Sequence, residues 1–189
     1  SHELRTPLTI ITGFAEYLSA NVEETLTDQQ MQYVEVMQRN GQQLSRLVDD
    51  LLDVARVESG RFEVNRIQLD AGDLMRSVIR DCEAVVAQKS QRIRSDISGI
   101  SGATARMSGD RERLTQVFSN LIGNASKYSD DCSEIEIRAW AEGGWFLFEV
   151  TDHGMGISEA DVSKIFHSFY RAPELKSQNV PGTGLGLVI

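Results

Sequence analysis

Two runs of apolar residues at alternating three- and four-residue spacings constrain the fold of this chain most. The first run comprises Leu4, Leu8, Ile11, Ala15, Leu18 and Val22. The second follows Val34, Met37, Gly41, Leu44, Val48, Leu51, Ala55 and Glu58, of which all but Gly41 and Glu58 are apolar. This spacing predicts two helices, each with one apolar stripe, as in a helical bundle. Thr27 or Asp28 is the expected N-cap of the second helix, and Gly60 is its stop signal.

A hairpin of two such helices buries too little apolar surface to be stable by itself. Two hairpins together close a four-helix bundle with a continuous core. The pattern therefore predicts a homodimer formed through residues 1–60. The alternative is a hairpin that packs its stripe against the downstream part of its own chain.

The composition excludes several classes of protein. With 189 residues, 41% hydrophobic and 25% charged, we expect a globular protein of one or two domains. A net charge of −9 without a basic stripe argues against a nucleic-acid partner. Cys82 and Cys132 show no zinc or disulfide pattern. Since no apolar run approaches the roughly 20 residues of a membrane span, we expect the chain itself to be soluble and cytoplasmic.

The patterns change near residue 60, where we place a domain boundary between residues 1–60 and 61–189. In the second part, alternating apolar residues and turn signals predict strands between helices. The expected strands are 62–67, 92–97 paired with 103–108, and a hairpin of 134–141 with 145–152. The expected helices are 71–90, capped by Asp70, and a helix from Asp110 to about Lys127. The fold class is α+β, with an α/β sandwich following the helical hairpin.

Asn120, Asn124 and Lys127 recur at four- and three-residue steps, so they share one face of the expected helix. Magnesium prefers hard oxygen ligands and usually keeps waters and nucleotide phosphates among them. Two amides and an ammonium on one face therefore suit a metal triphosphate. Taken alone, this spacing is much more often that of polar residues on a solvated helix face.

The segment Asp152 to Ile157 reads D-x-G-x-G-I and follows an apolar strand. Gly154 and Gly156 would let the backbone approach a ligand, and the carboxylate could accept an adenine amino proton. An ordinary turn after a strand uses the same residue types.

Glycines 182, 184 and 186 form a second glycine segment, GTGLGL, whose N–H groups could face phosphate oxygens. A helix that begins near Leu185 would add its positive dipole end. Between the glycine segments lies IFHSFYR, in which aromatic side chains are expected to anchor a loop and leave Arg171 to contact phosphate.

Taken in order, HELRTP, NLIGNASKYS, DHGMGI, IFHSFYR and GTGLGL resemble the motifs of the histidine kinases of two-component systems. The resemblance covers nearly the whole chain. It implies a HisKA dimerisation and phosphotransfer hairpin at 1–60 and a Bergerat-type ATP-binding domain at 61–189. ATP and Mg²⁺ are the implied cofactors, and a cognate response regulator is the implied partner.

The resemblance also assigns roles. Asn124 would ligate magnesium with the help of Asn120, Asp152 would bind adenine, and residues 171–184 would form a lid. The implied nucleotide-binding set is Asn120, Asn124, Lys127, Tyr128, Asp152, Gly154, Gly156, Ile157, Arg171, Gly182, Thr183, Gly184, Leu185 and Gly186.

For the reaction, the neutral imidazole of His2 would attack the γ-phosphate. By the resemblance, Glu3 would take the proton from the other ring nitrogen, and Thr6 would orient a water for dephosphorylating the partner. We expect the chain to be a fragment, so that His2 sits in a frayed first turn and any membrane anchor lies elsewhere in the parent.

The sequence leaves two alternatives to a histidine kinase. The first is an ATP-hydrolysing member of the same nucleotide-binding superfamily, but such enzymes carry Glu at the position of Asn120, and an amide cannot activate water. The second is a scaffold that binds nucleotide without transferring phosphate. The intact His2, Asn124 and Asp152 argue against it.

Overall fold

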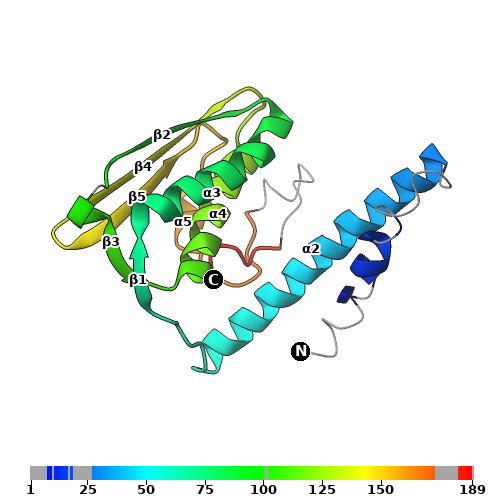
Figure 1. Ribbon diagram of the computed structural model, residues 1–189, viewed down its shortest axis with the longest axis horizontal. Helices are drawn as coiled ribbons and strands as arrows, with labels where there is room; N and C mark the ends of the chain where they lie inside the picture. The colour runs from blue at the N-terminus through cyan, green and yellow to red at the C-terminus, as the bar shows by residue number, and fades with distance from the viewer. Residues whose placement is uncertain are drawn as a thin grey trace. The chain divides into compact units, whose positions relative to one another are not determined.

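In the computed structural model, residues 8, 9, 11–16, 18, 27–100, 102–172 and 183–188 are described. The chain divides into two compact units, and the boundary between them in the sequence lies between Phe62 and Glu63. The first unit is helical, and the second combines helices with strands (Figure 1). A helical N-terminal part followed by an α/β part confirms the predicted fold class.

Helix α2 spans Asp28–Glu58 and has the predicted cap. The Thr27 hydroxyl accepts a hydrogen bond from the Gln30 backbone N–H at 3.3 Å, and the Gln30 side chain accepts one from the Thr27 N–H at 2.9 Å. This reciprocal pair satisfies two N–H groups that the helix start leaves without partners. At the other end, Gly60 takes the left-handed conformation with φ +66°, as its role as a stop signal requires.

The first unit also contains the helical residues 8, 9, 11–16 and 18. Gly41 marks a close approach, because a Cβ atom there would lie 2.5 Å from the Thr12 Cγ2 atom. Leu8, Ala15, Val34 and Val54 are buried. Several other apolar side chains of α2 are exposed, namely Tyr33, Val36, Met37, Leu44, Leu51 and Val57. A single chain thus leaves much of the α2 apolar surface uncovered.

The second unit contains two sheets. Its strands are β1 (Ile67–Asp70), β2 (Arg92–Gly99), β3 (Arg106–Gly109), β4 (Glu134–Glu142) and β5 (Trp145–Thr151). Its helices are α3 (Ala71–Val86), α4 (Arg111–Tyr128) and α5 (Glu159–Val162), with 3₁₀ turns at Ala87–Lys89 and Gly102–Ala105. Strands β1 and β3 pair antiparallel, and the larger sheet has the order β2-β4-β5.

Two predictions about the strands were wrong. Residues 62–66 form no strand, and β1 begins at Ile67, where β3 provides an antiparallel partner. Strands β2 and β3 do not pair with each other, because β2 lies parallel to β4 and β3 lies against β1. Alternation reveals a strand but not its partner, and a parallel pair needs a long crossover, which here contains α4.

Helix α3 begins after the predicted cap Asp70 but ends at Val86, four residues before the predicted Ser90, which has φ +56°. The hairpin of β4 and β5 forms as predicted, with Gly143 and Gly144 at φ +59° and +83° in its turn.

The core lies between the β2-β4-β5 sheet and the two helices α3 and α4, which pack together against one face of it (Figure 1). Alternate residues of β4 face this core, and Ile135 and Ile137 are completely buried. The Phe118 ring of α4 lies 4.5 Å from that of Phe148 on β5, between centroids. The long axis of α4 is therefore fixed by apolar packing. Among the described residues, no helix is long and apolar enough to cross a bilayer.

Two valines of α3 give a matched test of this core. Val78 is 0% exposed and Val85 is 53% exposed. We expect Val78→Ala to lower the free energy of unfolding by about 2 kcal/mol, since it loses buried methyl groups and leaves a cavity. Val85→Ala should change it by less than about 0.5 kcal/mol. Urea unfolding measures both, and equal losses would contradict the packing described.

Candidate nucleotide site

Helix α4 carries the first motif, and its N-terminus is held by one carboxylate. Asp110 accepts hydrogen bonds from the N–H groups of Glu112 at 3.1 Å and Arg113 at 3.2 Å. It also accepts one from the Asn65 N–H at 2.9 Å. These bonds, that from Asn65 above all, hold the pKa of Asp110 below its ordinary value. The N-cap thus ties the helix to the segment that precedes β1.

The predicted face of α4 is present. Asn120, Asn124 and Lys127 are all half-buried. The Asn120 Nδ2 atom donates to the Gly186 carbonyl at 3.1 Å, so the amide oxygen of Asn120 remains available as an acceptor. Within the described part of the chain, the side chain of Asn124 makes no hydrogen bond to another residue. The Lys127 ammonium lies 3.0 Å from the Tyr128 hydroxyl and 4.7 Å from the centre of its ring.

The loop after β5 lies on the last turn of this helix. Asp152 is exposed, and its carboxylate accepts a hydrogen bond from the Gly154 N–H at 2.9 Å. A side chain at Gly154 would collide with the Tyr128 carbonyl oxygen, and the Met155 N–H reaches that oxygen at 3.4 Å. Gly156 has φ +70°. Ile157 is 54% exposed. Glycine is therefore needed at 154 for close approach, and it brings the first two motifs together.

The second glycine segment meets both α4 and the aromatic segment. The Phe169 N–H donates to the Gly184 carbonyl at 2.9 Å. Gly184 has φ +75°, and a Cβ atom there would lie 2.6 Å from the Tyr170 carbonyl oxygen. Leu185 is 2% exposed and anchors the segment, while Thr183 accepts a bond from the Leu185 N–H through its hydroxyl at 3.3 Å. The second glycine segment thus links Asn120 of α4 to the aromatic segment.

The helix predicted to begin near Leu185 does not form within residues 183–188. Residues 186–188 make a turn, closed by the Val188 N–H and the Leu185 carbonyl at 2.9 Å. A single turn does not establish a helix dipole at this place. Gly182 and residues 173–181 of the predicted lid lie outside the described residues.

Sequence reasoning missed Asp161 of α5. This carboxylate is 6% exposed and accepts hydrogen bonds from the Tyr170 hydroxyl at 2.5 Å and the Ser158 hydroxyl at 2.7 Å. The Lys164 ammonium lies 3.5 Å away. The bond from Tyr170, followed by that from Ser158, lowers the pKa of Asp161. Asp161 thus holds the side chain of Tyr170, the residue that immediately precedes the half-buried Arg171. In the sequence, the S-x-x-D spacing of Ser158 and Asp161 is the signal that could have indicated a contact between these two side chains.

The residues predicted for chemistry at the other end of the chain are His2, Glu3 and Thr6. All three lie outside the described residues, so their arrangement stays a prediction.

Two known protein families match this chain, one at each end. Residues 109–189 match the family described as histidine kinase-, DNA gyrase B- and HSP90-like ATPase. Residues 1–60 match the His Kinase A (phospho-acceptor) domain. Of the three groups that the first description names, the histidine kinases are the one that the second match also names. The chain belongs to the histidine kinases.

Individual relatives agree with this assignment. The chain is 34% identical to the phosphate regulon sensor protein PhoR of Pseudomonas aeruginosa over 189 residues, covering 100% of this chain and 42% of PhoR. It is 32% identical to the sensor histidine kinase WalK of Bacillus subtilis, covering 100% of this chain and 30% of WalK. The crystal structure of full-length ShkA in complex with AMPPNP matches with a TM-score of 0.75 and 29% identity, over 99% of this chain and 37% of that chain. The chain thus spans less than half the length of each of these relatives.

The hydrogen bonds to Asp161 should make the free energy of unfolding decrease in acid, because they stabilise the ionised carboxylate. Because the pKa of Asp161 is below its ordinary value of 3.8, its contribution is fully present above about pH 4 and is lost as the pH falls toward the folded-state pKa. We expect Tyr170→Phe to be less stable than the parent at pH 7, with the difference shrinking below pH 4. Urea unfolding at pH 7 and pH 3 measures this.

The control is Tyr33→Phe, which removes a hydroxyl from an exposed tyrosine of α2. It should leave stability nearly unchanged at both pH values. A Tyr170→Phe defect of the same size at pH 7 and pH 3 would mean that the hydroxyl does not act through the ionised carboxylate.

Proposed function

We propose that this kinase binds ATP with Mg²⁺, transfers the γ-phosphoryl group to His2, and passes it to an aspartate of a response regulator. The observation that carries the proposal is the convergence of the α4 face, the Asp152 loop and the Gly184–Gly186 segment, in a chain whose residues 1–60 match a phospho-acceptor domain. The reaction would take place in the cytoplasm, where ATP and response regulators are available.

The side chains at the site fit a nucleotide. Lys127 offers a positive donor for phosphate, and the backbone of Gly186 lies against Asn120 with no side chain between them. Asp152 is exposed just after β5, where its carboxylate would accept a hydrogen bond from an adenine amino group. Phosphate and adenine would therefore be bound at two positions along one face.

The site also fits a magnesium ion held jointly with the nucleotide. Asn124 and the amide oxygen of Asn120 would supply neutral oxygen ligands, and bound phosphates would supply the rest. No group of three or more His, Cys, Asp or Glu side chains arranged for a metal occurs in the described part of the chain. Magnesium, when bound, would neutralise the charge that develops on the phosphates.

For transfer, a nitrogen of the neutral His2 imidazole forms the new bond to the γ-phosphorus, while the bond from that phosphorus to the bridging oxygen breaks and ADP leaves. Glu3 would accept the proton from the other ring nitrogen. A response-regulator aspartate would then take the phosphoryl group from His2. Thr6 would orient a water molecule for the opposing reaction, which is the dephosphorylation of the response regulator.

Hydrolysis of ATP to free phosphate is the competing activity. It needs a general base beside the nucleotide, and the helix has Asn120 at the position where a carboxylate would be required. The amide nitrogen of Asn120 is already engaged with the Gly186 carbonyl at 3.1 Å, and an amide oxygen does not accept a proton at neutral pH. The helix therefore favours transfer over hydrolysis.

The α2 surface favours a homodimer. Met37, Leu44 and Leu51 follow the predicted stripe and are 46%, 51% and 45% exposed in one chain. Their spacing is that of a bundle seam. A second copy of the hairpin would cover them and close a four-helix bundle through residues 1–60.

The phosphorylation test uses γ-labelled ATP with magnesium. We expect the parent to acquire label that is acid-labile and alkali-stable, as a phosphohistidine is. His2→Gln should remove the label entirely, and Asn124→Ala should lower the labelling rate by about 100-fold or more, because a lost ligand weakens charge stabilisation in the transition state.

His167→Gln is the matched control. The chain has three histidines, and His167 is exposed. Label that survives His2→Gln but disappears in His167→Gln would contradict the proposed acceptor. Binding of ATP without any label in the parent would favour a non-catalytic scaffold.

The dimer test replaces Leu44 by glutamate. A buried leucine contributes about 1.5–3 kcal/mol, and the change occurs twice in a symmetric dimer. We therefore expect Leu44→Glu to weaken dimerisation by at least about tenfold in sedimentation equilibrium. Gln43→Glu adds the same charge to an exposed neighbour and should leave the dimer intact. A parent that stays monomeric at all concentrations would overturn the dimer.

A further inference from the structure

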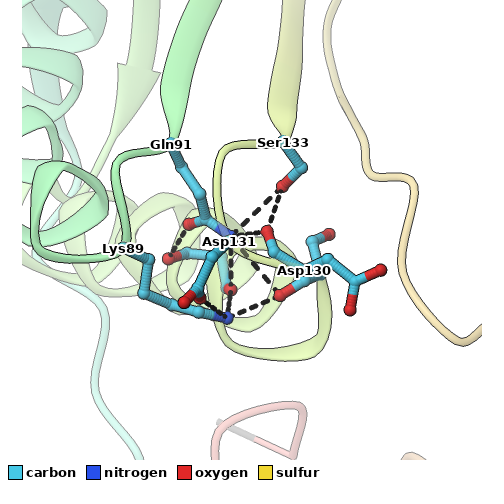
Figure 2. A network of polar contacts seen from close by, with 7 residues as sticks. Lys89, Gln91, Asp130, Asp131 and Ser133 are labelled. Carbon is cyan, nitrogen blue, oxygen red and sulfur yellow. Dashed lines mark hydrogen bonds and ion pairs between the residues drawn. The ribbon is translucent and has the colours of Figure 1, made fainter.

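A network of polar contacts lies at the C-terminal end of α4 (Figure 2). Its centre is the ammonium of Lys89, which comes from the 3₁₀ turn after α3. The Nζ atom lies 3.1 Å from the Ser126 carbonyl oxygen and 2.5 Å from that of Ser129. The Asp131 carboxylate is 3.6 Å away and exposed. The lysine thus donates chiefly to backbone carbonyls rather than to a carboxylate.

Gln91 completes the network from just before β2. It is 4% exposed, and its amide nitrogen donates to the carbonyls of Ser126 at 3.0 Å and Asp130 at 2.9 Å. Its amide oxygen accepts from the Ser126 hydroxyl at 2.6 Å. Figure 2 shows Lys89 and Gln91 pointing toward the same group of carbonyls.

The reason for a cation here is physical. The last carbonyls of a helix have no partner within the helix, and a positive charge near them is favourable because the helix dipole is negative at that end. Ser126 and Ser129 are both buried, so water does not readily replace the side chains that bind their carbonyls.

The same turn of α4 forms part of the nucleotide site. Lys127 and Tyr128 lie between the two serines, and the Tyr128 carbonyl receives the Met155 N–H at 3.4 Å. Gly154 packs against that carbonyl. The turn is therefore held by two sets of contacts. Lys89 and Gln91 bind the Ser126 carbonyl, and the loop that carries Asp152 binds the Tyr128 carbonyl.

We propose that Lys89, supported by Gln91, is a positioning residue for nucleotide binding. Its ammonium fixes the final turn of α4, so that Lys127 and the Asp152 loop keep the separation that a nucleotide needs. Lys89 itself interacts with Ser126, Ser129 and Asp131, and therefore acts on Lys127 and Asp152 indirectly. The inference rests on the proposed binding of ATP, and it names a lysine outside the sequence motifs as one of the residues that determine affinity.

Chemical rescue tests it. Lys89→Ala removes the three outer methylenes and the ammonium, which together correspond to propylammonium. The Lys89 side chain is 33% exposed, so a small amine has a route to the gap. We expect Lys89→Ala to weaken binding of magnesium-ATP at least about fivefold by isothermal titration, and propylammonium to restore affinity in a saturable manner. Sodium chloride at equal ionic strength should not.

Two further variants of Lys89 separate positioning from general stability. Lys89→Met fills the space without the charge, so it should lose affinity as Lys89→Ala does but gain nothing from the amine. Lys89→Arg keeps a charge and should retain more affinity than Lys89→Met. Arg76→Ala, which breaks an exposed ion pair with Asp73 on α3, is the control and should bind as the parent does.

Each outcome decides the question. Binding by Lys89→Met or Lys89→Ala within twofold of the parent would overturn the proposal, as would lost affinity in Lys89→Ala that the amine fails to restore. If Lys89→Ala does not fold, the comparison of Lys89→Met with Lys89→Arg decides instead. A parent that binds no magnesium-ATP would refute the proposed function itself, whereas unchanged binding in the variants refutes only the role of Lys89.

Discussion

The fold of the second unit depends on how helix α4 is held. Apolar packing of Phe118 and Ile122 fixes its axis against the sheet, Asp110 holds its first turn, and Lys89 with Gln91 holds its last. A helix fixed at both ends and along one side presents its remaining face at a defined position. The loop of Asp152 and the segment of Gly186 then meet that face, so the site inherits its geometry from the helix.

The glycines of the site have two separate physical roles. Gly154 is required because the Tyr128 carbonyl leaves no room for a side chain, and Gly184 because the Tyr170 carbonyl leaves none. Gly156 and Gly184 are required because they adopt positive φ, which side chains disfavour. Close approach and backbone conformation together explain why a sequence so rich in glycine at these places still builds an ordered site, with Leu185 buried beneath it.

Several features followed directly from the sequence. The caps at Thr27, Asp70 and Asp110 act through atoms within three residues, so local sequence suffices to predict where α2, α3 and α4 begin. The β4–β5 hairpin is equally local, since its turn glycines adjoin both strands. By contrast, the pairing of β2 with β4 and of β1 with β3 joins segments far apart in the chain, and alternation of apolar residues does not specify a partner.

By itself, the sequence determined the family of this chain and the face of α4 that bears Asn120, Asn124 and Lys127, because helical periodicity and the order of motifs are properties of the chain. Only the tertiary structure decided which groups support that face. The carboxylate of Asp161 beneath Tyr170 and the ammonium of Lys89 at the end of α4 belong to no motif. Their importance arises from burial and from contacts between distant segments, which exist only after the chain has folded.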